Sequence, residues 1–312
     1  MNGRVVALSG GVGGAKLAQG LARVLASGEL SVVINTGDDF RHLGLWISPD
    51  IDSVVYALSD LSDPVRGWGR REETWTFMAA LKGLGGADWF ALGDADLAMH
   101  VERSRRLAAG ESLSTVTAGF GRALGIDARL LPMSDDPVST RLLTNEGWLE
   151  FQEYFVNRRC GPAVQRIEFQ GAAAARAHPE ALAALQDPDL RAVIICPSNP
   201  FVSIEPILAV PGFRAALEQC RAPVIAVTPL IGGKAIKGPA AKMMQELGYA
   251  ASGEAIGRRY SAFIDAFVTD ASDPAPAPIA GVTLVQAQTL MRTSEDRVQL
   301  AHAVLAIADR LT

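Results

Sequence analysis

The chain has 312 residues, of which 49% are hydrophobic and 20% charged, so it can bury a large core and is not expected to be disordered. Its net charge of −5 excludes the broad basic face of a duplex nucleic-acid binder, so an anionic substrate would be held by loops, helix ends and a metal. There is no signal-peptide pattern, no apolar run near the roughly 20 residues that span a bilayer, and no metal or disulfide spacing among Cys160, Cys196 and Cys220. We therefore expect a cytoplasmic protein that binds neither nucleic acid nor a membrane.

The first segment has the pattern of a strand, a glycine-rich turn, a helix and a second strand. Residues 5–9 form a short apolar run with β-branched side chains, and residues 31–35 (SVVIN) form another. Between them, after the glycine-rich residues 10–14, apolar side chains recur on one helical face as far as residue 25. This order predicts parallel strands joined by a right-handed crossover.

The same order returns in the second half of the chain. Residues 192–196 (AVIIC) and 223–228 (PVIAVT) are continuous apolar runs, which are typical of strands covered on both faces. Residues 204–221, between them, are helix-like. We therefore predict an α/β protein with a doubly wound, mostly parallel, Rossmann-like sheet, helices on both faces, and ligands at the carboxyl ends of the strands.

The segments around these blocks predict further elements. We expect helices at 75–81, 97–109 and 113–124, a strand or hairpin edge at 148–156, an alanine-rich helix at 171–185 broken at Pro179, a loop at 271–280 and a closing amphipathic helix at 294–311. No internal repeat or interdomain linker is evident. The chain is thus expected to be one domain over residues 1–312, with a smaller helical and β region inserted around 130–190.

The glycine turn after the first strand has the composition of a phosphate-binding loop. Gly10, Gly11, Gly13 and Gly14 would let backbone N–H groups approach phosphate oxygens, and the helix start beyond them favours negative charge. The turn lacks P-loop spacing, and Lys16 stands where the third glycine of a dinucleotide-binding fingerprint belongs. A tight turn without a ligand is the alternative, but contact with a nucleotide phosphate is the favoured interpretation.

Two acidic pairs follow the second strand. The first is Asp38 and Asp39, directly after the strand, and the second is Asp50 and Asp52, ahead of another apolar run. Taken singly, the second pair could merely complement the start of a helix. Grouped carboxylates repel one another unless a cation or hydrogen-bond donors compensate. Two such pairs after one strand predict a site for a hard cation with oxygen ligands, and Mg²⁺ fits that site.

Other polar stretches fall where loops are expected. Asp94 and Asp96 precede a predicted helix, and His100 lies four residues beyond Asp96, a spacing more typical of a helix-start ion pair than of a metal site. The segment 132–137 contains a further acidic pair in a predicted turn. The loops that end the two later strands contain Ser198, Asn199, Gly232, Gly233, Lys234 and Lys237. These glycines and lysines could bind phosphate, although simple exposure of the lysines is an equal alternative.

In this order, the motifs resemble the phospholactyl and phosphoenolpyruvyl transferases that build the side chain of the deazaflavin coenzyme F-420. The similarity is carried by residues 5–16, 35–39, 47–52, 67–70, 92–94, 131–140, 151–152, 197–200, 229–232 and 290–293. It covers nearly the whole chain, to about residue 270. Each motif alone is weak, but this many in register are specific.

The resemblance implies a magnesium-dependent transfer between two small-molecule substrates, the deazaflavin Fo and a guanylylated phospho-acid. The ribityl hydroxyl of Fo attacks the phosphorus bonded to the acid, and GMP leaves. Position by position, it implies catalytic roles for Asp39 and Asp52, Fo contacts from Asp50, Asp52 and Asp94, and metal ligation by Asp39, Asp50 and Asp52. It places the nucleotide at Gly10, Gly11, Gly13, Gly14, Lys16, Ser198, Asn199, Gly232 and Gly233, and it suggests a homodimer.

One departure concerns the acceptor site. Relatives carry basic residues on either side of a Leu-Gly-Asp motif, where this chain has Ala91 and Ala95, so Arg66, Arg70 or Arg71 is expected to compensate. The sequence does not choose among phospholactate, phosphoenolpyruvate and phosphoglycerate as the activated acid. It also leaves two other functional classes of protein as alternatives. The first is a non-catalytic regulator of gluconeogenesis that has the same fold and binds a nucleotide sugar. The second is an NAD-dependent oxidoreductase, which the failed glycine fingerprint disfavours.

Overall fold

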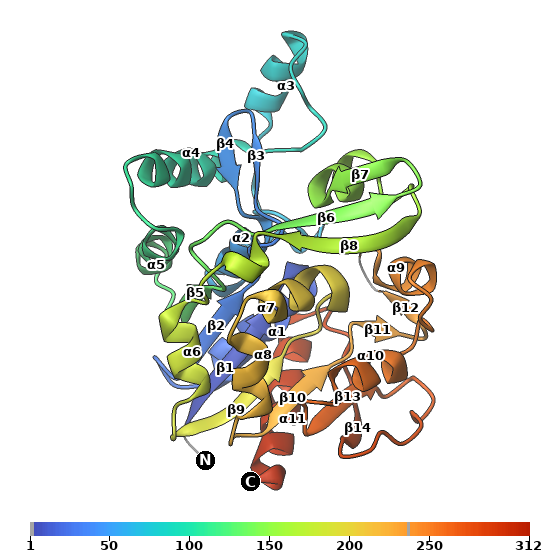
Figure 1. The fold of residues 1–312 in the computed structure, drawn as a ribbon. Coiled ribbons are helices and arrows are strands. Elements are labelled where there is room, and N and C mark those ends of the chain that lie inside the picture. Colours follow the sequence, from blue (N-terminus) through green and yellow to red (C-terminus); the bar gives the residue numbers. More distant parts are fainter. Residues whose placement is uncertain (1–2, 236–237) are drawn as a thin grey trace.

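A computed structural model describes residues 3–235 and 238–312. Its centre is a sheet of seven strands in the order β14-β13-β10-β9-β1-β2-β5, in which every neighbouring pair is parallel (Figure 1). The strands are β1 (Arg4–Ser9), β2 (Leu30–Ile34), β5 (Arg129–Pro132), β9 (Leu190–Ile195), β10 (Val224–Val227), β13 (Ala266–Asp270) and β14 (Thr283–Ala287). Along the chain, β2 and β5 are added on one side of β1, and then β9, β10, β13 and β14 are added on its other side. The switch between β1 and β9 is where a doubly wound sheet places its ligand crevice.

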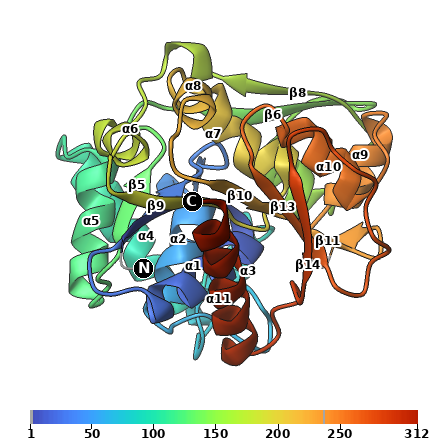
Figure 2. The same cartoon turned by 90° about the horizontal axis from the view of Figure 1, so that it is seen from below.

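Helices cover both faces of this sheet (Figure 2). Alternate side chains of the strands enter two separate cores, since Val5 and Ala7 face one side and Val6 and Leu8 the other. The first core is closed by α1 (Gly11–Val24), α2 (Pro49–Leu58), α5 (Leu113–Ala123) and α11 (Ser294–Leu311), and the second by α6 (Pro179–Leu185), α7 (Glu205–Ala209), α8 (Phe213–Glu218), α9 (Ala240–Glu246) and α10 (Gly253–Tyr260). The predicted fold class is therefore confirmed, and continuous apolar strands are explained by burial on both faces.

Two smaller units lie beyond the carboxyl edge of the sheet (Figure 1). One consists of the hairpin β3 (Phe40–His42) and β4 (Leu45–Ile47) with α3 (Thr76–Gly83) and α4 (Asp94–Ala108). The other is an antiparallel sheet of β6 (Ser139–Thr144), β7 (Gly147–Glu150) and β8 (Val164–Gln170), within the stretch where an inserted region was expected. Together with the sheet edge, these units form the walls of a cleft.

Three predicted elements differ from the structure. The alanine-rich helix expected at 171–185 is reduced to a short 3-10 turn at residues 172–174, and Pro179 begins α6 rather than breaking a helix. The helix expected at 204–221 is divided into α7 and α8, because the chain turns at Pro211 and Gly212, the latter with φ of 103°. The π-helix η3 (Pro200–Ile204) precedes α7. The strand expected at 148–156 ends early and continues as a second π-helix, η1 (Glu153–Asn157). The remaining short elements are η2 (Ala172–Ala174), β11 (Leu230–Ile231) and β12 (Lys234–Ala235).

The closing helix α11 occupies the predicted range, residues 294–311. Thr293 and Asp296 begin it with reciprocal side-chain to backbone hydrogen bonds, a capping box. Its buried face packs against α1, and the closest approach is at Gly20, where an added Cβ would lie 2.1 Å from the carbonyl oxygen of Arg297. In the described part of the chain, no helix is both long enough and apolar enough to cross a membrane.

Candidate active site

A cleft of about 780 Å³ lies at the carboxyl edge of the sheet, at the switch between β1 and β9. Its floor is the glycine turn after β1 and the Pro197–Asn199 segment after β9, and its sides come from α2, α4, the 66–69 and 89–91 loops, η1 and the 289–291 loop. Both π-helices contribute side chains to its lining, and π-helical turns are often found at functional sites. The cleft is therefore the candidate active site.

The glycine turn is the tightest part of the floor. Helix α1 already begins at Gly11, which has φ of +64°, so the glycines form its first turn rather than a loop before it. A Cβ on Gly13 would lie 2.4 Å from the carbonyl oxygen of Pro197, so the turn packs directly on the β9 loop. The first N–H groups of a helix have no acceptor within the helix. Here Gly10 N donates to the Ser198 hydroxyl at 3.3 Å and Gly11 N donates to Asp50, while Val12 and Gly13 also line the cleft. Close packing thus requires this turn, and a helix start of this kind favours a bound anion.

Asn35 and Asp50 hold the glycine turn to the end of β2. Asp50 accepts hydrogen bonds from Gly11 N at 2.7 Å and from Asn35 Nδ2 at 2.9 Å. The buried Asn35 amide also donates to the carbonyl of Val202 in η3 at 3.1 Å. Burial, the largest influence, raises the pKa of Asp50 to about 6. Asp50 therefore serves as a rigid part of the floor and carries a carboxylate into the cleft.

The two acids after β2 point in different directions. Asp38 lines the cleft, and its buried Oδ1 has no hydrogen-bond partner among the described residues. Burial and the nearby charge of Asp50 raise the pKa of Asp38 well above its usual range. Asp39 accepts hydrogen bonds at Oδ2 from the Ser48 hydroxyl at 2.7 Å and the Trp46 indole at 3.2 Å, and its buried Oδ1, like that of Asp38, has no partner among the described residues. Burial raises the pKa of Asp39 to about 8. Asp39 lies outside the cleft lining, which differs from its predicted catalytic and metal-binding role.

Asp52 is paired with a buried arginine. Both Asp52 oxygens accept from the guanidinium of Arg103, Oδ1 from Nη2 and Oδ2 from Nη1 at 3.3 Å. Arg103 has no exposed surface, and its Nη1 also lies 3.4 Å from Trp46 O and 3.2 Å from His100 Nδ1. Asp52 itself lines the cleft, so this pair places a charge-compensated carboxylate in its wall.

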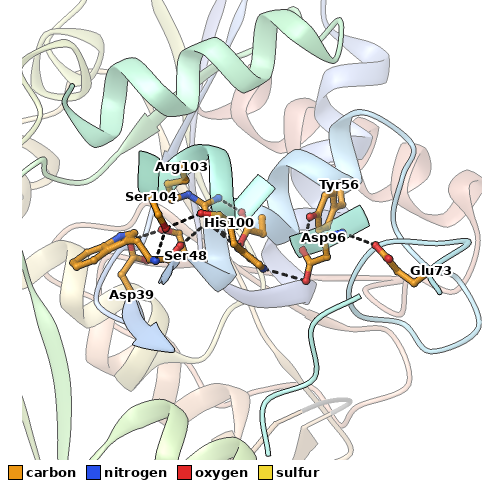
Figure 3. A network of polar contacts seen from close by, with 10 residues as sticks. Asp39, Ser48, Tyr56, Glu73, Asp96, His100, Arg103 and Ser104 are labelled. Atoms are coloured by element: carbon orange, nitrogen blue, oxygen red, sulfur yellow. Dashed lines mark hydrogen bonds and ion pairs between the residues drawn. The ribbon is translucent and has the colours of Figure 1, made fainter. Parts of the chain in front are cut away.

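One face of α4 continues this network (Figure 3). His100 Nε2 lies 3.1 Å from Asp96, and the hydroxyl of Tyr56 donates to Asp96 at 2.5 Å. Burial disfavours ionisation of Asp96, but the hydrogen bond and charge of His100 outweigh it and lower the pKa. Asp96, His100 and Tyr56 all line the cleft, and the Asp96–His100 pair has the helix-start spacing expected from the sequence.

Asp94 was predicted to contact Fo, but its hydrogen bonds go to the start of a helix. Its carboxylate accepts from the backbone N–H groups of Thr76 and Phe77 and from the Thr74 hydroxyl, so it caps the start of α3. In return, Glu73 caps the start of α4 through Ala95 N and Asp96 N. Asp94 is not part of the cleft lining, because its hydrogen bonds turn it toward α3 rather than toward a ligand.

The upper wall of the cleft is aromatic. Trp89 and Phe90 line it, and behind them Phe40 packs edge-on against Phe90 with ring centroids 4.9 Å apart. Trp68, which is 49% exposed, lies at the rim beside Arg66. Of the three arginines considered in place of basic residues at 91 and 95, Arg66 lines the cleft, and Arg70 does not. Both have acidic neighbours, since Arg66 lies 3.9 Å from Asp63 and Arg70 lies 3.9 Å from Glu73, and the Arg66 guanidinium also lies 4.4 Å from the centre of the Trp75 ring. Among the described residues, the lysine and arginine side chains that line the cleft are those of Lys16 and Arg66.

Lys16 is held at the opposite wall by the 289–291 loop. Its Nζ donates to the carbonyl of Met291 at 2.9 Å. Asp270, at the end of β13, accepts from the N–H and hydroxyl of Thr289 at 2.8 and 2.9 Å and thereby fixes this loop. Burial alone would raise the pKa of Asp270, but these bonds and those from Ser272 lower it to about 2.

The predicted site residues divide into two groups. Those that line the cleft are Gly10, Gly11, Gly13, Lys16, Asp50, Asp52, Ser198 and Asn199, and those outside its lining are Gly14, Asp39, Asp94, Gly232 and Gly233. Gly14 packs against Ser9 and Ser198, and the other two glycines lie in the turn between β11 and β12. Lys234 is exposed on β12, and Lys237 is outside the described residues.

The site contains residues that the sequence analysis did not single out. Arg103 lies inside the helix predicted at 97–109, and Trp89 and Phe90 of the aromatic wall come from a segment outside the motifs quoted above. Asn35 was part of a quoted motif, but its hydrogen bonds to Asp50 and Val202 depend on the fold. Within residues 3–235 and 238–312, no three His, Cys, Asp or Glu side chains form a ready-made metal cluster.

Comparison with known proteins assigns the chain to a family. The family model described as 2-phospho-L-lactate transferase CofD matches residues 5–307. The chain is 40% identical over 318 residues to a phosphoenolpyruvate transferase of Kitasatospora aureofaciens, covering 99% of this chain and 98% of that protein. It is 39% identical over 308 residues to a 2-phospho-L-lactate transferase of Methanosarcina acetivorans, covering 98% and 99%. Among solved structures, protein BH3568 of Bacillus halodurans shares the fold, with a TM-score of 0.66 at 16% identity over 98% of this chain and all of that one.

Proposed function

The chain belongs to the CofD family of 2-phospho-L-lactate transferases, and we propose that it transfers a phospho-acid from a GDP-activated donor to the deazaflavin Fo. The observation that carries this proposal is one cleft with two unlike ends. A helix N-terminus suited to a diphosphate lies at one end, and an aromatic wall suited to a flat ring system at the other. Carboxylates of α2 lie between them.

The chemistry requires one bond to form and one to break. The ribityl hydroxyl oxygen of Fo bonds to the phosphorus that carries the acid, the bond from that phosphorus to the GMP phosphate breaks, and the hydroxyl proton is released. Such transfer depends mainly on in-line positioning and on stabilisation of charge. In our proposal, the N–H groups at the start of α1 and Lys16 hold the diphosphate, and Asp52 accepts a hydrogen bond from the attacking hydroxyl.

Two carboxylates of the cleft fit a divalent cation. Asp38 and Asp50 are buried side chains that line the cleft, their pKa values are raised, and Asp38 has an oxygen without a hydrogen-bond partner among the described residues. Mg²⁺ takes few protein ligands and shares the rest of its sphere with water and phosphate, so two carboxylates suffice. A bound Mg²⁺ would neutralise the diphosphate and the charge that develops on GMP. We therefore propose Asp38 and Asp50 as its ligands.

The aromatic wall supports the choice of acceptor. Trp68, Trp89 and Phe90 offer flat apolar surfaces, and Arg66 is a cation in the same lining. In our proposal, this group receives the deazaflavin ring and Arg66 takes the place of the basic residues absent at Ala91 and Ala95. Phospholactate, phosphoenolpyruvate and phosphoglycerate are treated equally as the acid of the activated donor.

The proposal is tested by product analysis. Fo, Mg²⁺ and the purified protein are incubated with each of the three guanylylated acids, and the products are identified by mass spectrometry. We expect GMP and a phosphodiester of Fo with one acid in preference to the others, no product in EDTA, and no product from Asp52→Asn despite an intact fold. Binding of a nucleotide sugar with no turnover of any of the three donors would instead identify a regulator of the same fold.

A further inference from the structure

Both partners of the Asp52–Arg103 pair are buried, which distinguishes it from most ion pairs among the described residues. Asp52 is 5% exposed and Arg103 is fully buried, and the buried His100 lies beside them, whereas the Arg105–Glu102 pair on the same helix lies at the surface. A buried ion pair recovers its desolvation cost only with good geometry and further hydrogen bonds, so it is weak evidence of a purely stabilising role. Its position in the wall of the cleft suggests another reason for it.

Arg103 is held rigidly from several sides. Its Nη1 lies near the Trp46 carbonyl of β4, which in turn is fixed because Trp46 N donates to the Ser104 hydroxyl at 2.7 Å. The guanidinium also lies 5.8 Å from the centre of the Phe120 ring in α5. A planar guanidinium anchored in this way can direct a carboxylate through two hydrogen bonds, which a lysine cannot do.

Asp52 occupies the boundary between the two ends of the cleft. Two residues before it, Asp50 is tied to the glycine turn, and four residues after it, Tyr56 is tied to Asp96, which lines the same cleft as Trp89 and Phe90. A hydroxyl bound in the cleft can hydrogen-bond to Asp52 only if this carboxylate is kept at the cleft wall. Arg103 supplies that restraint from behind.

We propose that Arg103 is a positioning residue that fixes the Asp52 carboxylate for the acceptor hydroxyl, and that the reaction depends on Arg103 only through Asp52. This inference rests on the proposed function. It excludes a general structural role, in which loss of the guanidinium would weaken activity whether or not Asp52 is present. It also excludes direct contact of Arg103 with substrate, because Arg103 is not part of the cleft lining.

The test is a double-mutant cycle of wild type, R103K, D52N and D52N/R103K. Lysine keeps the charge but loses the two-pronged geometry. The dissociation constant for Fo is measured by fluorescence titration without donor, and kcat and KM are measured with the preferred donor. We expect R103K to weaken Fo binding and to lower kcat about tenfold each, and to change Fo affinity less than about twofold in the D52N background. R105K, at the exposed pair on the same helix, is the matched control and should behave as wild type.

A milder variant guards against loss of folding in R103K. Phe120→Leu leaves both charges in place and removes only the ring beside the guanidinium, so it should cause a smaller loss in the same direction that again disappears in the D52N background. Equal losses in both backgrounds, or no loss from either variant, would overturn the role of Arg103. A wild type that neither binds nor converts Fo would overturn the proposed function and this inference with it.

Discussion

At the scale of single residues, Asp38 and Asp39 are adjacent in sequence but differ in surroundings. Asp38 lines the cleft, while Asp39 hydrogen-bonds to Ser48 and Trp46. Because burial raises the pKa of Asp39 to about 8, this side chain is mostly protonated at pH 7, and asparagine is a close mimic of that form.

We expect Asp38→Asn to lower kcat/KM about 100-fold and to weaken the response to Mg²⁺, as loss of a metal ligand does. Asp39→Asn, one position away, is the matched control and should stay within about threefold of wild type. The measurement is steady-state transfer over a range of Mg²⁺ concentrations. The reverse pattern, with Asp39→Asn inactive and Asp38→Asn normal, would return the metal site to the position predicted from sequence.

Asp270 gives a prediction about stability and pH. Its pKa is about 2, below the ordinary value for an aspartate, so between about pH 2 and pH 4 the folded chain binds fewer protons at this site than the unfolded chain. Its contribution to stability is therefore present above about pH 4 and is lost as the pH falls toward 2.

Asp270→Asn should lower the free energy of unfolding by about 2 kcal/mol near pH 6 and by less near pH 3, because charged hydrogen bonds of this kind contribute about that much. Urea unfolding at the two pH values measures the difference. Asp189→Asn, at an exposed position, is the control and should change neither value. A loss that is the same at both pH values would mean that the Asp270 charge does not contribute.

At the scale of elements, the crossing of α1 and α11 depends on a residue without a side chain. A Cβ at Gly20 would lie 2.1 Å from the Arg297 carbonyl, so the two helices would have to separate. Overpacking of this kind costs about 1–3 kcal/mol, which exceeds the gain in helix propensity from glycine to alanine.

Gly20→Ala should therefore destabilise the fold by about 1 kcal/mol net, measured by chemical denaturation. Gly83→Ala is a matched control, because Gly83 ends α3 and an added Cβ meets no atom within 4 Å. It should be neutral or stabilising by up to about 1 kcal/mol. If both substitutions stabilise the protein equally, the α1–α11 crossing is looser than the structure indicates.

At the scale of the whole molecule, the cleft joins the glycine turn, the end of β2 and the two smaller units beyond the sheet. A ligand that bridges these parts binds the folded state alone and should stabilise it. At about 100 times its dissociation constant, a ligand adds about 2.7 kcal/mol, which corresponds to a rise of roughly 5 °C in the melting temperature.

We expect GDP with Mg²⁺ to produce such a rise and GDP in EDTA to produce a smaller one, measured by differential scanning fluorimetry. Asp38→Asn should respond equally to GDP with and without Mg²⁺, because it lacks a metal ligand but keeps the glycine turn. NAD should have no effect. A shift with NAD and none with GDP would contradict the assignment of the glycine turn to a guanine nucleotide.

Many elements of the fold could be predicted because they depend on the local pattern of apolar residues. Residues 192–196 and 223–228 are apolar throughout, as strands covered on both faces must be, and the periodicity of residues 294–311 predicted α11. The helix expected at 204–221 is divided because a turn at Pro211 and Gly212 overrides the apolar pattern. The small antiparallel sheet was missed as separate strands, because its short segments lack a continuous apolar run.

The sequence by itself determined the parallel sheet, the family, and the position of a glycine turn at the end of β1, because all three depend on the order of residues along the chain. Only the tertiary structure decided that Asp38 rather than Asp39 faces the cleft and that Arg103 lies behind Asp52. The physical reason is that a side chain's direction depends on its hydrogen-bond partners. The partners of Asp39 and Asp52 belong to segments that come later in the sequence, and only folding brings these segments next to the two carboxylates.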